Sequence, residues 1–348
     1  MSFSSEEAQR YSRQIALREI GVDGQRKLRE ARVCIAGMGG LGCTSASQLA
    51  AMGVGFIRLI DQDVVDLANL HRQLLYDTSS LGYPKVEVAE KRLKLLNPNV
   101  KLDPVPLTIN SRTAEQIVKD VDMVIDGLDH FTPRYALNEA CVKLGVPYIF
   151  GGASQAYGNA STIIPGETAC LECMLGRVSD EGLPTCETVG IFPQVPTIVA
   201  SIQAREALSL MLGKKPSLAN KLLFCNINSM EFEVFPVVKV QSCSTCGKPI
   251  TPKISEASRA AELCGKNSFI VSPKGKVSLD MAETADLLSK KFRVKVRANM
   301  GVTFDYSDTI SISLMKTGNM LVKGIVEKER VLKVYAEIMK LLASRVHD

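Results

Sequence analysis

Apolar residues in the first half of the chain recur in two alternating patterns. Short apolar runs typical of buried strands are separated by longer segments with apolar positions at helical spacing. We expect strands at 33–36, 55–60, 100–107, 123–126 and 148–150, and helices at 41–52, 85–96, 113–119 and 133–144, with one or two more within 4–30. This alternation predicts an α/β fold, a Rossmann-like doubly wound sheet that is mainly parallel.

The pattern changes after about residue 150. The segment GGASQAYGNASTIIPG is typical of antiparallel strands joined by turns, and a loop rich in Gly, Pro and Cys follows at 166–194. A long amphipathic helix is expected at 196–212, and further strands within 221–240. We therefore interpret residues 1–250 as one domain whose parallel sheet has an antiparallel extension.

The last third of the chain predicts a second, smaller unit. Residues 251–265 are polar and are interpreted as a linker, and residues 266–348 as a small α+β domain. Its expected strands lie at 268–271, 292–297, 309–314 and 320–323, and its expected helices at 279–290 and 327–343. A ubiquitin-fold-like or other partner-docking role fits this domain, and so does a role in stability or dimerisation only.

Composition and charge exclude several classes of protein. The 348 residues carry a net charge of +5 without a basic cluster, which argues against a nucleic-acid partner. No apolar run has the length of a membrane span, and the polar start MSFSSEEAQRYSRQ lacks a secretory signal. We therefore expect a cytoplasmic protein with reduced thiols, whose ten cysteines are core residues, metal ligands or nucleophiles.

A glycine-rich turn follows the first predicted strand. Its pattern G-x-G-x-x-G comprises Gly37, Gly39 and Gly42, with Gly40 as an additional glycine. Such a turn lets backbone and helix-start amides approach a phosphate, and Asp61, at the end of the next strand, suits ribose hydroxyls. An NAD-dependent oxidoreductase is the first interpretation of this pattern, and a turn without a ligand is the alternative.

The residues that follow the turn favour a triphosphate over a dinucleotide. The segment DQDVVDLANLHRQ supplies Asp63, Asn69, Arg72 and Gln73, and GYPKVEVA supplies Lys85. Cations at the strand ends can neutralise charge on phosphorus and on departing pyrophosphate, and Asp129 in DGLDHFTPRYALN can hold magnesium. Taken singly, each of these residues is also compatible with a solvated surface position.

The cysteines fall into groups. Cys170 and Cys173 form one C-x-x-C pair, and Cys243 and Cys246 form another, which together predict a structural four-thiolate zinc site. A redox role for one pair is the alternative. Cys186 lies in the Gly- and Pro-flanked segment EGLPTCETVG, where no helix or strand is expected, and is a candidate nucleophile or a loop residue without chemistry. Cys34, Cys43, Cys141 and Cys225 are expected in the core, and Cys264 is left undecided.

These motifs together resemble the ubiquitin-activating superfamily, which includes the ThiF and MoeB adenylyltransferases. The resemblance runs from RYSRQIALREIGVDGQRKL through GMGGLG, DQDVVDLANLHRQ, GYPKVEVA, DGLDHFTPRYALN and TCETVG to CLEC and CSTC. It implies that the chain binds Mg-ATP and the Gly-Gly tail of a β-grasp protein, and converts the tail carboxylate into an acyl-adenylate. One departure is His130, where the family often has Asn.

The resemblance also implies roles for individual residues. Asp61 holds the ribose; Asn69, Arg72, Gln73 and Lys85 hold phosphates; and Asp129 holds magnesium. Arg13 reaches across a symmetric homodimer to the partner's ATP, and Cys186 lies in a loop that crosses the adenylate.

The sequence leaves four functions open. The favoured one is activation of a ubiquitin-like protein, with a thioester on Cys186 and transfer to a conjugating enzyme. The second is adenylation of a sulfur-carrier protein for cofactor synthesis or tRNA thiolation. An NAD-dependent oxidoreductase and an inactive scaffold that binds a β-grasp partner are the others.

Overall fold

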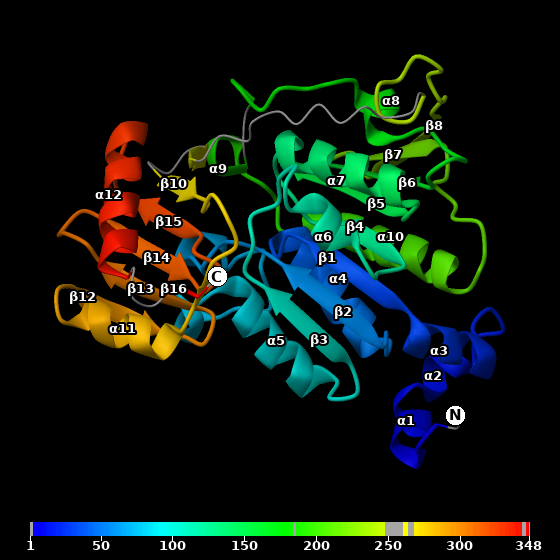
Figure 1. The fold of residues 1–348 in the computed structure, drawn as a ribbon. Coiled ribbons are helices and arrows are strands. Elements are labelled where there is room, and N and C mark those ends of the chain that lie inside the picture. The colour runs from blue at the N-terminus through cyan, green and yellow to red at the C-terminus, as the bar shows by residue number, and fades with distance from the viewer. Residues whose placement is uncertain (1–2, 184–185, 248–259, 264–267, 343–345, 348) are drawn as a thin grey trace.

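The computed structural model describes residues 3–183, 186–247, 260–263, 268–342 and 346–347. Two layered units are visible in Figure 1, a large one with the N-terminal helices at its far end and a smaller one formed by about the last quarter of the chain. The helices are α1 Ser5–Arg10, α2 Ser12–Ile15, α3 Gly21–Glu30, α4 Gly40–Ala51, α5 Lys85–Leu96, α6 Ala114–Val118, α7 Phe131–Leu144, α8 Leu171–Leu175, α9 Cys186–Val189, α10 Gln194–Met211, α11 Met281–Ser289 and α12 Lys328–Leu341, with 3₁₀ turns η1 Leu67–Asn69 and η2 Thr78–Ser80.

The large unit is built on an eight-stranded sheet of order β3-β2-β1-β4-β5-β6-β7-β8. Its strands are β1 Arg32–Ala36, β2 Phe56–Ile60, β3 Lys101–Val105, β4 Met123–Asp126, β5 Tyr148–Ser154, β6 Tyr157–Ile163, β7 Lys221–Asn226 and β8 Glu231–Pro236. β1 to β5 pair in parallel, and β5 to β8 pair antiparallel. The predicted mainly parallel sheet with an antiparallel extension is confirmed.

Side chains that alternate along β1 explain why both faces of this sheet are covered. Val33 and Ile35 pack into a core shared with α3, α4, α5 and α10. Cys34 and Ala36 pack into a second core shared with α6 and α7 on the other face. Because successive side chains of a strand point to opposite faces, a strand buried on both faces is continuously apolar, as VCIA is after the half-buried Arg32. Within the described residues, no helix is long and apolar enough to cross a bilayer.

The small unit is a wholly antiparallel six-stranded sheet of order β12-β13-β14-β15-β10-β9, with α11 and α12 packed on its core. Its strands are β9 Ala260–Leu263, β10 Ser268–Val271, β12 Arg293–Arg297, β13 Gly301–Asp305, β14 Ser311–Met315 and β15 Met320–Lys323, with β11 Ser278–Leu279 pairing separately with β16 Val346–His347. Three features differ from expectation. Residues 260–263 form edge strand β9 rather than linker, and neither β13 nor the β11–β16 pair was expected.

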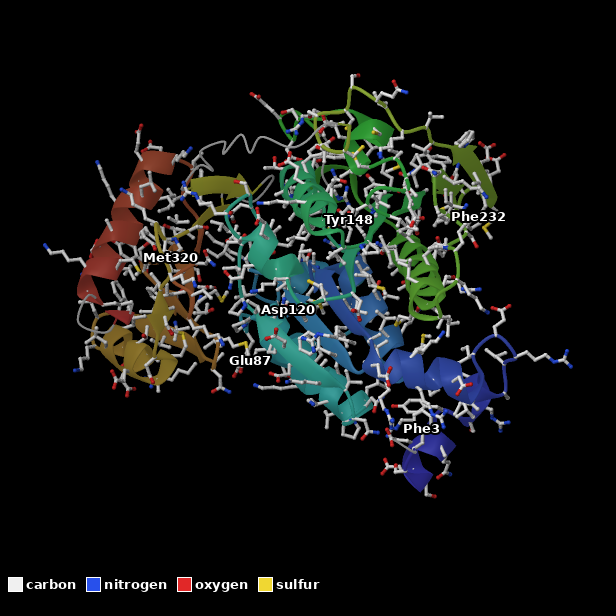
Figure 2. The ribbon with its side chains drawn as sticks, turned by 45° about the vertical axis from the view of Figure 1, so that its right-hand side comes forward. Phe3, Glu87, Asp120, Tyr148, Phe232 and Met320 are labelled. Carbon is white, nitrogen blue, oxygen red and sulfur yellow. The ribbon has the colours of Figure 1, made fainter. Side chains whose placement is uncertain are left out.

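The small unit packs against the large one beside α5. In Figure 2, Glu87 on α5 lies on the side of the large unit that faces the sheet carrying Met320. The contact includes the apolar cluster of Val64, Ile270, Met315 and Leu321, all of which are buried. The two units therefore share a solvent-excluded interface.

Candidate active site

The glycine turn joins the end of β1 directly to the start of α4. Gly37 has φ of +94°, a conformation that favours glycine, and a Cβ added at Gly42 would lie 1.8 Å from the carbonyl oxygen of Gly37. Gly39 is the residue before the helix and Gly40 is its first residue. Gly37 and Gly42 therefore let the backbone pack closely on itself. The first amides of a helix have no intrahelical partner, and the start of α4 can therefore receive an anion.

Asp61 follows β2 and lies against this turn. Its carboxylate accepts hydrogen bonds from the amide of Met38 and the amide of Asp63, each at 2.7 Å. Burial raises the pKa of Asp61, and the nearby Lys85 ammonium opposes that shift. The structure thus brings the predicted ribose-binding carboxylate to the predicted phosphate turn.

Lys85 is a buried cation at the same edge of the sheet. It is the first residue of α5, its side chain is 5% exposed, and its Nζ lies 3.1 Å from Asp63 Oδ2. Burial acts to lower the pKa of Lys85, but the carboxylates of Asp61, Asp63 and Asp129 outweigh it and hold the pKa above its usual value. The ammonium therefore stays charged at neutral pH.

The loop between β2 and α5 carries the other predicted phosphate ligands. Asn69 is buried at the end of η1, and its carbonyl oxygen accepts hydrogen bonds from the amides of Arg72 and Gln73, both at 3.1 Å. A Cβ on Gly39 would lie 3.8 Å from Gln73 Nε2, so this side chain reaches the glycine turn. Buried Asp63 Oδ1 and Gln73 Oε1 have no hydrogen-bond partner among the described residues.

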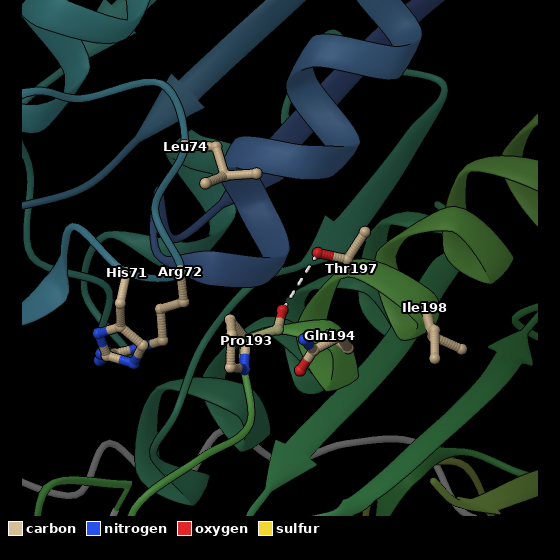
Figure 3. Close-up of a pocket in the computed structure, with 7 residues that line it drawn as sticks. All are labelled: His71, Arg72, Leu74, Pro193, Gln194, Thr197 and Ile198. Carbon is tan, nitrogen blue, oxygen red and sulfur yellow. Dashed lines mark hydrogen bonds between the residues drawn. The ribbon is translucent and has the colours of Figure 1, made fainter. Parts of the chain in front are cut away.

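Arg72 lines a cavity of about 400 Å³ between this loop and the start of α10. Figure 3 shows the side chains of His71 and Arg72 extending from the loop beside Pro193 and Gln194. Within the described part of the chain, no hydrogen bond or ion pair of the Arg72 guanidinium is found. A cation with this freedom is available to a bound anion.

Asp129 follows β4, the neighbour of β1, and its side chain is exposed. His130 Nδ1 lies 2.8 Å from Asp129 Oδ1. Desolvation acts to raise the pKa of Asp129, but the hydrogen bond and charge of His130, with Lys85 and Arg134, hold it below its usual range. His130, which departs from the family pattern, therefore contacts the predicted magnesium ligand itself.

Arg134, in the segment DGLDHFTPRYALN, has an internal role. Its Nε lies 3.1 Å from Asp126 Oδ2, and its Nη2 donates to the Gly151 carbonyl at 2.7 Å. It is buried and ties β4, α7 and β5 together. Its charge still contributes to the lowered pKa of Asp129.

Asp180 is a site residue that sequence reasoning missed. Its carboxylate accepts from the amides of Phe131 at 2.6 Å and Thr132 at 2.9 Å, and so caps the start of α7 next to Asp129. Asp180 is 49 residues from Phe131 in the sequence, so no local capping pattern predicts this contact. The contact holds Asp180 itself at the start of α7.

Cys186 is the first residue of the short helix α9, in a segment where no helix was expected. Its side chain lies outside what the structure describes, and so does Cys264. The four cysteines expected in the core are buried, which confirms that prediction: Cys34, Cys43, Cys141 and Cys225. Burial raises the pKa of the Cys43 thiol to about 12, so it is not an activated nucleophile.

The two C-x-x-C pairs meet within the same unit. The Sγ atoms of Cys170, Cys173, Cys243 and Cys246 lie within 4.8 Å of one another, with separations of 3.4, 3.6 and 3.9 Å among them. Tetrahedral zinc with bonds of about 2.3 Å places its sulfur ligands roughly 3.8 Å apart. The geometry therefore fits zinc, and four thiolates leave no position for a reacting water.

Arg13 is not brought to this site within one chain. It is exposed on α2, and its neighbour Gln14 donates from Nε2 to the Met52 carbonyl at 2.8 Å, beyond the carboxyl end of α4. The glycine turn lies at the opposite end of α4, a helix of 12 residues and therefore about 18 Å long.

The sequence of this chain is similar to a known protein family and to several named proteins. The ThiF family model matches residues 11–246. A Thermus thermophilus sulfur carrier protein adenylyltransferase is 37% identical over 73% of this chain and 96% of its own length. A Bacillus subtilis sulfur carrier protein ThiS adenylyltransferase is 33% identical over 94% and 98%, and a Haloferax volcanii SAMP-activating enzyme E1 is 35% identical over 71% and 92%.

Solved structures agree with the sequence comparison. The crystal structure of Escherichia coli MccB with ATP superposes with a TM-score of 0.62 at 27% identity, covering 69% of this chain and 75% of that one. Since the family model spans most of the chain and the relatives are covered almost completely, the assignment rests on the whole large unit. The chain belongs to the ThiF family.

Proposed function

We propose that this chain uses Mg-ATP to adenylate the C-terminal glycine of a sulfur-carrier protein of the β-grasp type with a Gly-Gly tail. The observation that carries the proposal is the convergence of Asp61, Lys85 and the Asn69–Gln73 segment on the glycine turn. A carboxylate for ribose and cations for phosphates meet there, and two of the relatives named above, from Thermus and Bacillus, are named for sulfur carriers.

Each group has a defined part in this proposal. Asp61 accepts from the ribose hydroxyls, while the first amides of α4 with Asn69, Arg72, Gln73 and Lys85 bind the phosphates. Asp129, whose pKa is held low, supplies a carboxylate for magnesium. Bound magnesium would neutralise charge on the phosphate oxygens.

The chemical step is an in-line displacement. A tail carboxylate oxygen forms a bond to the α-phosphorus of ATP while the α–β phosphoanhydride bond breaks, and pyrophosphate leaves with the electron pair. The tail carboxylate is already ionised near neutral pH, so the step requires no general base. The protein's contribution is to align two anions and to neutralise their repulsion, which the buried Lys85 ammonium is placed to do.

The relatives favour sulfur carriers over the reading that the sequence placed first. The Thermus and Bacillus proteins are named for sulfur carriers, whereas the Haloferax protein is named an E1. Thioester formation on Cys186 followed by transfer to a conjugating enzyme is therefore the second candidate, supported by the Haloferax relative.

Pyrophosphate–ATP exchange tests the proposal directly. We expect exchange of labelled pyrophosphate into ATP that depends on added sulfur-carrier protein and disappears when its terminal glycine is deleted. A chain that binds Mg-ATP but gives no exchange with ThiS-like or MoaD-like carriers contradicts the sulfur-carrier proposal. The Cys186→Ala variant should retain exchange; a carrier adduct that is cleaved by thiols in the wild type and absent from this variant would support the second candidate.

We further propose a homodimer in which Arg13 of each chain completes the partner's site, because Arg13 lies at the far end of α4 from its own glycine turn. Arg13→Ala and Lys85→Met should each be inactive alone. Mixed after dissociation and reassociation, they form heterodimers with one intact site, so that roughly a quarter of wild-type exchange should return. Full inactivity of the mixture, with heterodimers verified by mass, contradicts this arrangement.

We also propose that the four-cysteine cluster holds one structural zinc and that the protein works in the cytoplasm, where these thiols remain reduced.

A further inference from the structure

The small C-terminal unit contacts the loop that carries the proposed phosphate ligands. Lys323, the last residue of β15, places Nζ 2.6 Å from Asp66 Oδ2. Asp66 is the residue before η1, and its other oxygen, Oδ1, accepts from the Ala68 amide at 3.1 Å. One carboxylate thus caps the turn that ends at Asn69 and, at the same time, binds a lysine from the other unit.

Two further hydrogen bonds hold the second end of this loop. Thr303 Oγ1 in β13 donates to the Gly82 carbonyl at 2.8 Å, and the Met300 amide donates to Glu87 Oε2 at 2.9 Å. Glu87 is buried on the first turn of α5, two residues after Lys85. The C-terminal unit therefore contacts the loop before Asn69 and again on both sides of Lys85.

Apolar packing closes the interface between these polar contacts. Val64, 5% exposed, packs against Ile270, Met315 and Leu321 from three strands of the small sheet. The loop ends also pair with each other, since the Val65 amide donates to the Tyr83 carbonyl at 2.9 Å. The sheet thus covers the point where the loop leaves and re-enters the large unit.

We propose that Lys323 is a positioning residue for ATP binding, acting through Asp66 on the Asn69–Gln73 segment, with the Thr303 and Met300 contacts supporting Lys85 from the other side. The inference rests on the proposed function. Lys323 orients the Asp66 carboxylate, the carboxylate fixes η1, and the Asn69 carbonyl at the end of η1 receives the amides of Arg72 and Gln73. The C-terminal unit therefore pre-orders a site that it need not touch.

Relatives differ in whether they have room for this unit, and the Bacillus relative aligns over 94% of this chain. The Thermus relative aligns over 259 residues, which is 96% of its own length but only 73% of this chain. A relative of that length is too short to contain the large unit and also a unit of the size of residues 260–347. In the present chain the C-terminal unit supports the loop that carries the proposed phosphate ligands.

Calorimetric titration of the full-length protein with Mg-ATP tests the proposal. Lys323→Met removes the ammonium, and the Kd for Mg-ATP should rise about fivefold, as the loss of a half-buried ion pair predicts. Lys323→Arg should stay within about twofold of the wild type, because its guanidinium can bind the same carboxylate. In exchange assays Lys323→Met should raise the KM for ATP with little change in kcat, whereas partial unfolding lowers kcat at constant KM.

Lys295→Met is the matched control. Lys295 lies in the same sheet and forms an ion pair of the same 2.6 Å length, but with Asp305 inside the C-terminal unit. If Lys323→Met binds Mg-ATP as the wild type does, or if Lys295→Met weakens binding equally, the positioning role is refuted while the proposed function stands. If the wild type binds Mg-ATP but shows no carrier-dependent exchange, the function fails and the calorimetric comparison still decides the positioning role. Absence of Mg-ATP binding by the wild type overturns both.

Discussion

Glu172 offers a sharp test of how the two halves of the proposed zinc site are assembled. It lies between Cys170 and Cys173, and its carboxylate accepts from Ser244 Oγ and Thr245 Oγ1, each at 2.5 Å. These hydroxyls lie between Cys243 and Cys246, so a single carboxylate joins the two knuckles across 73 residues of chain. The perturbation is Glu172→Met, which keeps the side-chain length and removes both acceptors.

The expected loss follows from the burial of the two hydroxyls. A hydrogen bond to a charged group contributes about 1.5–3 kcal/mol. Ser244 is exposed and can bind water instead, whereas Thr245 is 2% exposed and cannot. Only the hydrogen bond from Thr245 is therefore expected to contribute its full free energy. Zinc affinity should fall about 10- to 100-fold, the usual range for residues that support metal ligands. Thr245→Val should reproduce most of this loss and Ser244→Ala little of it.

The assay is competition for zinc against a chromophoric chelator at pH 7. Hydrogen bonds from Ser244 and Thr245 outweigh desolvation and lower the pKa of Glu172, so its contribution is present above the unfolded pKa, near 4.5, and is lost as pH falls below it. Neutral pH thus keeps the carboxylate ionised. Glu139→Met is the control, because Glu139 shares the Arg177 ion pair but is not bonded to either hydroxyl. A change below threefold for Glu172→Met, or an equal change for Glu139→Met, refutes the reasoning.

Two substitutions test the nucleotide site itself. Gly42→Ala places a methyl group 1.8 Å from the Gly37 carbonyl oxygen, so calorimetry should find no Mg-ATP binding. Gly40→Ala should weaken binding less, because the nearest contacts of its methyl group lie at 3.2 Å on the Pro196 ring. Equal binding by the two variants would contradict this packing argument. Lys85→Met leaves Asp61 and Asp63 without their shared cation, so the Kd for Mg-ATP should rise at least about 100-fold. The free energy of unfolding, measured by denaturant titration, should fall by about 2 kcal/mol. A Kd within threefold of the wild type would mean that the phosphates bind elsewhere.

The parts of the site that the sequence predicted are those encoded over short distances. The glycine turn joins two consecutive elements, and the helix expected at 41–52 is observed at Gly40–Ala51. Asp61 lies next to the turn because adjacent parallel strands end at the same edge of the sheet. Each C-x-x-C pair is also local, and zinc chemistry supplied the rule that unites the two pairs.

The parts that the sequence did not reveal depend on distant partners. Asp180 caps α7 across 49 residues, and Lys323 binds Asp66 across 257. The sequence around Lys323 predicts a strand but gives no indication of a distant ion-pair partner. Residues 260–263 were assigned to the linker because their neighbours are polar, yet they form β9 by pairing with β10. A signal for β13 did exist, since Val302 and Phe304 alternate with less apolar residues and both are buried.

The interface between the two units has a thermodynamic consequence that runs in both directions. The segment between Asp61 and Lys85 has only two short 3₁₀ turns, and a loop of this length is expensive to order unless other parts of the structure hold it. Contacts made before ATP arrives remove part of that ordering cost from binding, which is the usual effect of preorganisation. Thermodynamic linkage requires a reverse effect of equal free energy. If the Lys323 contact strengthens ATP binding, then bound ATP must strengthen the docking of the C-terminal unit on the loop by the same free energy. If Lys323 has the proposed positioning role, the Lys323–Asp66 pair couples nucleotide occupancy to the position of a whole unit that lies outside the proposed nucleotide site.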